Sequence, residues 1–283
     1  SVASSRICVN MRKSTQIIED MEREKKNMEF FPSGFILLDK ALYGGFLKKE
    51  IIVLGAFTGI GKSIFAAQVF YYLASKGFKS GYFSLEISGE MIVSRLIGQL
   101  ANIKPARIMS GLLDIEEYDK RAEAKAEVIA YNELMDFYDD LYLLEEIATA
   151  IRNNNYEFVV IDFIQNILLK NSMEEYARLS FVAVQLQKLA KEMNCCILVL
   201  SQLSNAVGKN GSRVVEYKGS GAIAQVADLG FFLERENPEV DSSGNPLGQQ
   251  KVKLFLRKNR RGVSGISFDF DFIHPGGQIL EKL

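Results

Sequence analysis

The chain has 283 residues, of which 48% are hydrophobic and 24% are charged, and its formal net charge is −1. These values suit a globular protein with a sizeable core, built as one large α/β domain or two small ones, and exclude binding of nucleic acid through bulk charge. No apolar run approaches about 18 residues and no signal-peptide pattern opens the chain, so we expect no membrane partner.

The first 30 residues differ from the rest in composition. "STQIIEDMEREKKNME" (14–29) is highly charged, and Ile17, Ile18, Met21 and Met28 fall near one helical stripe. A short helix cannot bury such a stripe alone, so it packs on its own domain or docks on a neighbouring subunit. We predict a linker helix in residues 1–30 that docks on a neighbour, and one domain over residues 31–283. Because the chain begins at Ser1 rather than Met, a further N-terminal domain is left open.

From Lys49 onward, short apolar runs alternate with helical stretches. A long amphipathic stretch covers 114–137. Ser88 is a candidate helix cap, and Gly77 ends the first helix. The expected helices are 62–77, 89–102 and 174–193, and the expected strands are 50–56, 80–86, 158–164, 195–202, 229–234, 251–257 and 267–272. This order predicts an α/β fold with a doubly wound, mostly parallel sheet covered by helices on both faces. The C-terminal strands lack helices between them and are expected to form an antiparallel extension.

The stretch "LGAFTGIGKS" (54–63) resembles a phosphate-binding loop between a strand and a helix. Such a loop needs inward-facing N–H groups, small residues at tight positions, a lysine for the phosphates and a hydroxyl for Mg²⁺. Gly59 and Gly61 supply the permissive backbone, and Lys62 and Ser63 supply the charge and the metal ligand. Ala56 stands where the strict pattern has glycine, a small intrusion. The predicted nucleotide-binding residues are Ala56, Phe57, Thr58, Gly59, Ile60, Gly61, Lys62, Ser63 and Ile64, together with Asp162.

Polar residues follow three apolar strands: Glu86, Asp162 and Gln202. In an open α/β sheet, ligands gather outside the carboxyl ends of the strands. One acid there can hold Mg²⁺ through water, and another can deprotonate an attacking water. An amide such as Gln202 is a poor base, but it can hydrogen-bond the γ-phosphate and report its loss.

The cysteines and the histidine carry no predicted chemistry. Cys195 and Cys196 lie in an apolar run and are predicted to be reduced thiols in the core, and Cys8 is remote from them in the sequence. Reduced thiols favour a cytoplasmic protein. His274 has no neighbouring Cys or His with which to hold a metal. A basic run of six residues is ordinarily a solvated face: Lys251, Lys253, Arg257, Lys258, Arg260 and Arg261.

Several ordered motifs resemble the RecA-type motor domain of DnaB-type replicative helicases, over about 32–272. They are "SGFILLDKAL" before the loop, "SLEIS" (84–88), "VVIDFIQ" (159–165), "LVLSQLS" (198–204), "YKGSGAIAQVADL" (217–229) and "KNRRGVSG" (258–265). That family tolerates alanine at the first loop position. Two departures stand out: "FVAVQLQKL" (181–189) replaces charged residues, and Lys218 and Gly219 replace an Arg-Glu pair. Neither the family's N-terminal helical collar nor a primase segment is expected in this chain.

The resemblance implies roles for individual residues. Glu86 would be the catalytic glutamate, Asp162 the Walker-B acid and Gln202 the coupling glutamine, while Lys258 and Arg260 would reach into the neighbouring subunit's ATP site. Lys218, Gly219 and Gly221 would grip single-stranded DNA. The stretch 204–219, read as flexible, adds Lys209 and Arg213 to the DNA-binding set, with a plain surface loop as the alternative.

The function that follows from the resemblance is an ATP- and Mg²⁺-dependent 5′-to-3′ replicative DNA helicase motor acting as a hexameric ring on single-stranded DNA. Primase and a helicase loader are the further partners that the family implies. One alternative is a KaiC- or recombinase-like ATPase that acts on duplex DNA or protein. Another is a ring-forming adaptor that binds ATP as structural glue, against which Glu86 argues, since a scaffold needs no water-activating acid.

Overall fold

The computed structural model describes residues 13–25, 30–207, 213–218, 221–237 and 249–282. The chain divides into two compact units, Ser1–Phe30 and Phe31–Leu283. In the first unit, α1 covers Ser14–Lys25, which confirms a helix there, and its Ile17 and Ile18 side chains are exposed. The backbone of Met21 lies in α1, but its side chain and the whole of Met28 and Cys8 fall outside the described residues.

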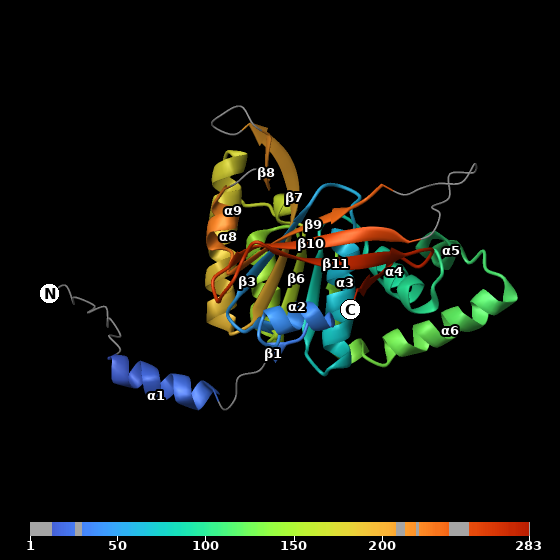
Figure 1. Ribbon diagram of the computed structural model, residues 1–283, viewed down its shortest axis with the longest axis horizontal. Coiled ribbons are helices and arrows are strands. Elements are labelled where there is room, and N and C mark those ends of the chain that lie inside the picture. Colours follow the sequence, from blue (N-terminus) through green and yellow to red (C-terminus); the bar gives the residue numbers. More distant parts are fainter. Residues whose placement is uncertain (1–12, 26–29, 208–212, 219–220, 238–248, 283) are drawn as a thin grey trace. The chain divides into compact units, whose positions relative to one another are not determined.

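The second unit is built on one large sheet (Figure 1). Its strands are β3 (Ile51–Ala56), β4 (Ser80–Ser84), β5 (Met135–Tyr138), β6 (Phe158–Asp162), β7 (Cys196–Val207), β8 (Arg213–Tyr217), β9 (Leu229–Arg235), β10 (Gln250–Asn259), β11 (Ile266–Ile273) and β12 (Gln278–Glu281). The strand order is β12-β11-β10-β9-β3-β7-β6-β4-β5, with β8 paired to β7. Strands β1 (Phe30–Phe31) and β2 (Phe46–Leu47) form a separate short pair.

The predicted doubly wound sheet is confirmed. The pairs β5–β4, β4–β6, β6–β7, β7–β3 and β3–β9 are all parallel. From β9 onward, β10, β11 and β12 continue the sheet in antiparallel register. The predicted antiparallel C-terminal extension is therefore confirmed, and it begins at β10. The run 229–234 becomes the parallel strand β9 because the short helix α9 (Gly221–Val226) carries the chain back to the start of the sheet.

Helices cover both faces of the sheet, as Figure 1 shows for α8 on one side and α3 and α4 on the other. The helices are α2 (Ile36–Ala41), α3 (Lys62–Ser75), α4 (Gly89–Ala101), α5 (Pro105–Ser110), α6 (Ile115–Ile129), α7 (Leu144–Asn154), α8 (Glu175–Met193) and α9, with 3₁₀ turns η1 (Asn132–Leu134) and η2 (Ile164–Asn166). Strand β3 shows the two-sided burial directly. Ile52 and Leu54 belong to the core cluster under α3, while Ile51 and Val53 belong to the cluster under α8.

Local signals in the sequence explain several element ends. Gly77 has φ +93° directly after α3, and the Ser88 hydroxyl accepts a hydrogen bond from the Met91 N–H at the start of α4. The amphipathic stretch 114–137 is not one element, because it contains α6, η1 and the edge strand β5. Helix α7 follows it and was not expected. The adjacent Cys195 and Cys196 are free and buried, as predicted for core thiols.

The stretch 204–219 was expected to be flexible, and that expectation was wrong for its described part. Strand β7 runs on to Val207 and pairs with β8 in antiparallel register from Leu203↔Tyr217 to Val207↔Arg213. The β7–β8 hairpin, drawn at the top of Figure 1, therefore continues β7 beyond Gln202, the last residue that pairs with β3. None of the helices among the described residues has the length and apolar character that a membrane crossing requires.

Candidate functional site

The loop between β3 and α3 has the backbone of a phosphate cradle. Gly59 has φ +80° and Gly61 has φ +117°, conformations that side-chain-bearing residues rarely adopt. Gly61 directly precedes Lys62, the first residue of the 14-residue helix α3. The helix therefore directs its unpaired N-terminal N–H groups and the positive end of its dipole toward the loop, which suits an anion.

A cavity of about 160 Å³ lies over this loop. It is lined by Thr58, Gly59, Gly61, Lys62, Ser63, Ile64, Glu86, Ile87, Arg95 and Gln202. The structure thus brings Glu86, after β4, and Gln202, on β7, to the loop that follows β3. Gln202 pairs in register with Ala56, the last residue of β3. The carboxyl ends of these parallel strands form one edge, as the sequence argument required.

Three of the predicted loop residues contribute backbone rather than side chain to this site. The methyl group of Ala56 is fully buried in the core, which explains why alanine fits the first loop position. Phe57 packs against the core under α8, and Ile60 packs against the core under α3. Only the backbone N–H groups of such residues can donate to a bound phosphate.

Lys62 and Asp162 are both buried at this edge. Lys62 is 8% exposed, and its Nζ donates to the carbonyl of Ala56 at 3.1 Å. Burial lowers the pKa of Lys62, while the carboxylates of Asp162 and Glu86 oppose the shift. Burial raises the pKa of Asp162, and the hydroxyls of Ser63 and Tyr82 oppose that shift. Lys62 and Asp162 are both removed from water, and neither charge is fully paired by the protein. A bound anion beside Lys62 and a cation beside Asp162 would therefore be favourable.

The carboxylate of Asp162 has an unused oxygen. Tyr82 donates its hydroxyl to Oδ2 at 2.9 Å, whereas Oδ1 is buried and has no hydrogen-bond partner among the described residues. A buried carboxylate oxygen without a partner is costly and calls for a water or an ion. Together with the Ser63 hydroxyl at the loop, this orphaned oxygen fits the oxygen-rich shell of Mg²⁺. Among the described residues, no cluster of three or more His, Cys, Asp or Glu side chains offers another metal site.

Two arginines at this edge were missed by the sequence argument. Arg95 lines the cavity from α4, on the stripe that also carries the buried Ile92 and Gln99. The sequence did contain a signal for Arg95, because a charged residue at helical spacing within an otherwise buried stripe indicates a functional side chain. Arg235 ends β9, donates to the Gly59 carbonyl at 2.7 Å and stacks 4.4 Å from the centroid of Phe272. The rule that selected Glu86, a polar residue at the carboxyl end of a strand, selects Arg235 equally.

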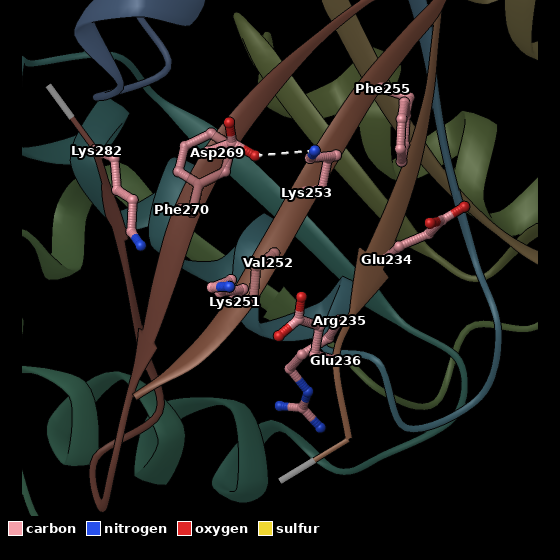
Figure 2. A pocket seen from close by; sticks show the side chains of 10 residues that line it. All are labelled: Glu234, Arg235, Glu236, Lys251, Val252, Lys253, Phe255, Asp269, Phe270 and Lys282. Atoms are coloured by element: carbon pink, nitrogen blue, oxygen red, sulfur yellow. Dashed lines mark ion pairs between the residues drawn. The ribbon is translucent and has the colours of Figure 1, made fainter. Parts of the chain in front are cut away.

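A larger hollow of about 660 Å³ lies on the antiparallel extension, away from the phosphate loop except at Arg235 (Figure 2). It is lined by Glu234, Arg235, Glu236, Lys251, Val252, Lys253, Phe255, Asp269, Phe270 and Lys282. Charges of both signs alternate there, and Lys253 pairs with Asp269 at 3.3 Å. This mixture is that of a solvated sheet face, because it offers no concentration of one charge for a ligand.

The basic run, which covers β10 and the turn after it, divides into three parts. Lys251, Lys253 and Arg257 are exposed, as expected of a solvated face. Arg261 is structural, since its guanidinium donates to the carbonyls of Leu42 and Gly45, and it pairs with Glu50 at 2.9 Å.

Lys258 and Arg260 form the third part, and both contact the end of α9. Lys258 donates from Nζ to the carbonyls of Ala224 and Gln225, each at 2.8 Å. Arg260 donates to the Gln225 carbonyl at 2.7 Å and pairs with Asp228 at 2.8 Å. Burial lowers the pKa of Lys258, helped by the charge of Arg260.

These two cations lie at the opposite end of the sheet from the phosphate loop. Lys258 is level with Gly230, and Gly230 is level with Val53 of β3. Arg260 continues away from Ala56, and its N–H donates to the carbonyl of Asp228, before β9 begins. The structure therefore does not bring Lys258 and Arg260 to the chain's own cavity.

The predicted DNA-binding residues that the structure describes are Arg213, Lys218 and Gly221, at the β7–β8 hairpin and its exit. Arg213 begins β8, but its side chain is not described, and Lys209 and Gly219 lie outside the described residues. Lys218 is exposed directly after β8, and Gly221 is exposed at the start of α9. The hairpin is anchored by Tyr217, which packs on Phe232 with ring centroids 5.1 Å apart. Gly55 permits this packing, because a Cβ there would stand 2.8 Å from Cε1 of Tyr217.

A parallel sheet covered on both faces, with a phosphate loop and polar groups at the carboxyl ends of its strands, places the chain in the class of P-loop nucleotide-binding domains, and similar solved structures give this class the RecA-like fold. Known proteins agree with this class. One solved ATPase domain superposes with a TM-score of 0.77 at 24% identity, covering 95% of this chain and 97% of that one. A KaiC-like protein from Pyrococcus horikoshii has a TM-score of 0.60 at 19% identity, covering 90% of this chain and all of the other.

The family model for the DnaB-like helicase C terminal domain matches residues 31–274, and the chain belongs to this family. The replicative DNA helicase DnaB of Treponema pallidum is 27% identical over 255 residues, which cover 88% of this chain and 55% of that protein. The chain thus spans about half the length of the curated relatives it matches. The resemblance inferred from the motifs is confirmed at the level of the domain.

Proposed function

We propose that the chain is the ATP-driven motor of a replicative DNA helicase, which moves 5′ to 3′ along single-stranded DNA as a hexameric ring and unwinds duplex DNA. The observation that carries the proposal is the division of one predicted ATP site between two ends of the sheet. The phosphate loop, Glu86 and Gln202 lie at the carboxyl ends of the strands, whereas Lys258 and Arg260 lie at the amino ends. In the proposed ring, a neighbouring copy would bring these ends together.

ATP would bind over the phosphate loop. The loop N–H groups and the α3 terminus would hold the phosphates, and Lys62 would leave the Ala56 carbonyl to contact the β- and γ-phosphates. Ser63 and Asp162 would hold Mg²⁺, an assignment supported by the unpartnered Oδ1 of Asp162. Mg²⁺ bound there would neutralise part of the phosphate charge.

Glu86 and Gln202 would have separate roles beside the γ-phosphate. Glu86 is exposed at the cavity, so its carboxylate can accept a proton from the attacking water. Gln202 would hydrogen-bond the γ-phosphate and lose that contact on hydrolysis. Arg235 and Arg95 would add positive charge at the rim, and the Arg235–Phe272 stack offers a flat surface beside Gly59.

Lys258 and Arg260 would complete the ATP site of the next subunit. Arg260 is 45% exposed and uses two of its nitrogen atoms to bind Asp228 and Gln225, so further N–H groups remain for a phosphate. A guanidinium held by its own chain in this way is pre-oriented, which reduces the entropy lost on binding. Hexameric assembly places six such sites around a ring.

Single-stranded DNA would contact the hairpin exits that line the channel of the ring. Lys218, Gly219 and Gly221 would form the main grip, with Lys209 and Arg213 adding phosphate contacts. The exposure of Lys218 and Gly221 supports this assignment. Cycles of hydrolysis would move these grips in sequence along the strand.

Residues 1–30 would tie neighbouring subunits together as a linker helix, with residues 31–283 forming the motor domain. The exposed Ile17 and Ile18 of α1 need an apolar partner. Exposed apolar side chains at the α5–α6 corner offer one on a neighbour, since Leu112 is 74% exposed and Ile115 is 86% exposed. Primase and a loader would be further partners in the cytoplasm.

The proposal is tested by fork unwinding with ATP and Mg²⁺, alongside a mass measurement of the assembly. Strand displacement by a hexamer is expected. ATP turnover without displacement would favour a KaiC- or recombinase-like ATPase, whose fold this chain shares at lower similarity. Assembly on ATP without turnover would instead favour a ring-forming adaptor.

A further inference from the structure

Gln165 lies between the candidate nucleotide cavity and the hairpin exit, and its side chain contacts both sides. It sits in η2, directly after the strand β6 that ends at Asp162. Its Nε2 donates to the Ser201 hydroxyl at 3.0 Å and to the Lys218 carbonyl at 2.9 Å, so both amide hydrogens are used. Its Oε1 accepts from the Gln202 N–H at 3.4 Å.

Gln202 and Lys218 are also joined directly. The Lys218 N–H donates to the Gln202 carbonyl at 2.7 Å. Gln202 lines the cavity, while Lys218 is exposed at the hairpin exit. Gln165 therefore closes a small ring of hydrogen bonds in which the backbone of Gln202 is fixed on one side and that of Lys218 on the other.

The position of Gln165 is itself fixed from the far side. Arg178 of α8 donates to the Gln165 carbonyl from both terminal guanidinium nitrogens, each at 3.1 Å, and it also donates to the Ile167 carbonyl. A side chain held by two engaged hydrogens on an anchored backbone has little freedom to absorb a shift of Gln202. Such a shift is passed on to Lys218, because leaving the part-buried amide of Gln165 unpaired is unfavourable.

We propose that Gln165 is a positioning residue that couples the state of the nucleotide cavity to the placement of Lys218. This inference rests on the proposed function, in which Gln202 contacts the γ-phosphate and Lys218 contacts DNA. When Gln202 moves with the γ-phosphate, Gln165 carries the displacement to the Lys218 carbonyl and changes the affinity of the hairpin exit for DNA. Gln165 does not line the candidate nucleotide cavity, so in this proposal it acts on the linkage between Gln202 and Lys218.

The test measures linkage by binding alone. The dissociation constant of a fluorescein-labelled oligothymidylate is measured with a non-hydrolysable ATP analogue and with ADP, for the full chain and for Gln165→Leu. Coupling between two sites typically changes affinity by about 5- to 150-fold, and we expect Gln165→Leu to bring the ratio of the two constants to within about twofold of one. ATP turnover without DNA is expected to stay close to that of the unaltered chain.

Two further variants keep the test decisive. Gln165→Glu preserves the shape and the acceptor for the Gln202 N–H but removes both donors. The ratio of the two DNA dissociation constants should therefore fall to within about twofold of one, as in Gln165→Leu. Gln68→Leu is the matched control, since Gln68 also makes two hydrogen bonds to a strand backbone, at 2.7 and 3.0 Å to Ile279, away from the Gln202–Lys218 link. Gln68→Leu should leave the ratio of the two DNA dissociation constants unchanged.

Each result decides one statement. A ratio unchanged in both Gln165 variants would overturn the inference, as would an equal loss in Gln68→Leu, since that would indicate general loosening of the fold. A fall in DNA-free turnover in the Gln165 variants would mean that Gln165 serves the hydrolysis itself, which also overturns it. An unaltered chain that fails to hydrolyse ATP would contradict the proposed function instead.

Discussion

Replacing Arg260 by alanine distinguishes a ring motor from an ATPase that is complete in one chain. The register across β10, β9 and β3 sets Lys258 level with Val53, three residues before Ala56. At about 3.3 Å per residue, Arg260 begins about 16 Å from the end of β3, farther than its side chain extends. Arg260 thus cannot reach the phosphate that Lys62 of its own chain would hold.

The expected loss is large in rate and small in stability. A guanidinium supplied to the γ-phosphate contributes about 10³ to 10⁵ in rate, or about 4 to 7 kcal/mol of barrier. The pair with Asp228 is half-exposed on the arginine side, so its removal should cost the fold at most about 1 kcal/mol. Arg260→Ala should therefore bind a labelled ATP analogue normally, unfold near the same temperature and hydrolyse ATP hardly at all.

A mixing assay then identifies the chain that supplies the arginine. Arg260→Ala and Lys62→Ala subunits are combined after mass measurement has shown that subunits exchange. Some interfaces then pair an intact loop with an intact arginine, and part of the turnover should return. Full activity of Arg260→Ala alone would refute the assignment. Exchange without recovery would mean that Arg260 acts in its own chain or that every interface must be intact.

Four further changes test the other parts of the site. Lys62→Ala should abolish turnover, measured as phosphate release, because the phosphates lose their main positive partner; unchanged release would remove the nucleotide site from the proposal. Glu86→Gln should keep analogue binding while lowering turnover by about 10²-fold or more, since an amide cannot accept the proton; lost binding would make Glu86 structural. Lys218→Ala should weaken oligothymidylate binding and flatten its salt dependence by about one phosphate contact, with DNA-free turnover unchanged; identical binding across salt would move the grip elsewhere. Ile115→Asp should reduce the assembly mass at a given concentration if α1 of a neighbour docks at the α5–α6 corner; Glu116→Ala, next to it and exposed, is the control that should leave the mass unchanged.

The phosphate loop and the ends of the parallel strands could be predicted because their signals are local. Glycines before a lysine, and polar residues after apolar runs, reflect backbone conformation and the single edge where parallel strands end. These rules correctly assembled Glu86 and Gln202 around the loop. The same rule was not applied to Arg235, because the expected strand ended at Glu234, one residue earlier.

The features of the fold that could not be predicted from the sequence depend on pairing between residues far apart in the chain. Strand β9 is parallel because its run pairs with β3, which lies far earlier in the chain, and no local pattern encodes that partner. The β7–β8 hairpin was interpreted as flexible because no local pattern predicts its pairing. The register places Tyr217 opposite Leu203, and Tyr217 lies close to Gly55, a residue about 160 positions earlier. Arg261 and Lys258 share one basic run, but only their carbonyl partners separate a structural residue from a candidate ATP contact.

The short helix α9 follows the hairpin exit in the chain and contacts Lys258 and Arg260 at its last carbonyls. On one side of α9, Gln202 in the cavity is joined to the hairpin exit through the side chain of Gln165 and the Lys218 N–H, and α9 begins three residues after Lys218. The last carbonyls of α9 receive Lys258 and Arg260. If α9 moved together with Lys218, its last carbonyls would carry that displacement to the two cations. In a ring, the state of one ATP site would thereby bias both the DNA grip of its own subunit and the contact made with the next site, which gives sequential firing a mechanical basis.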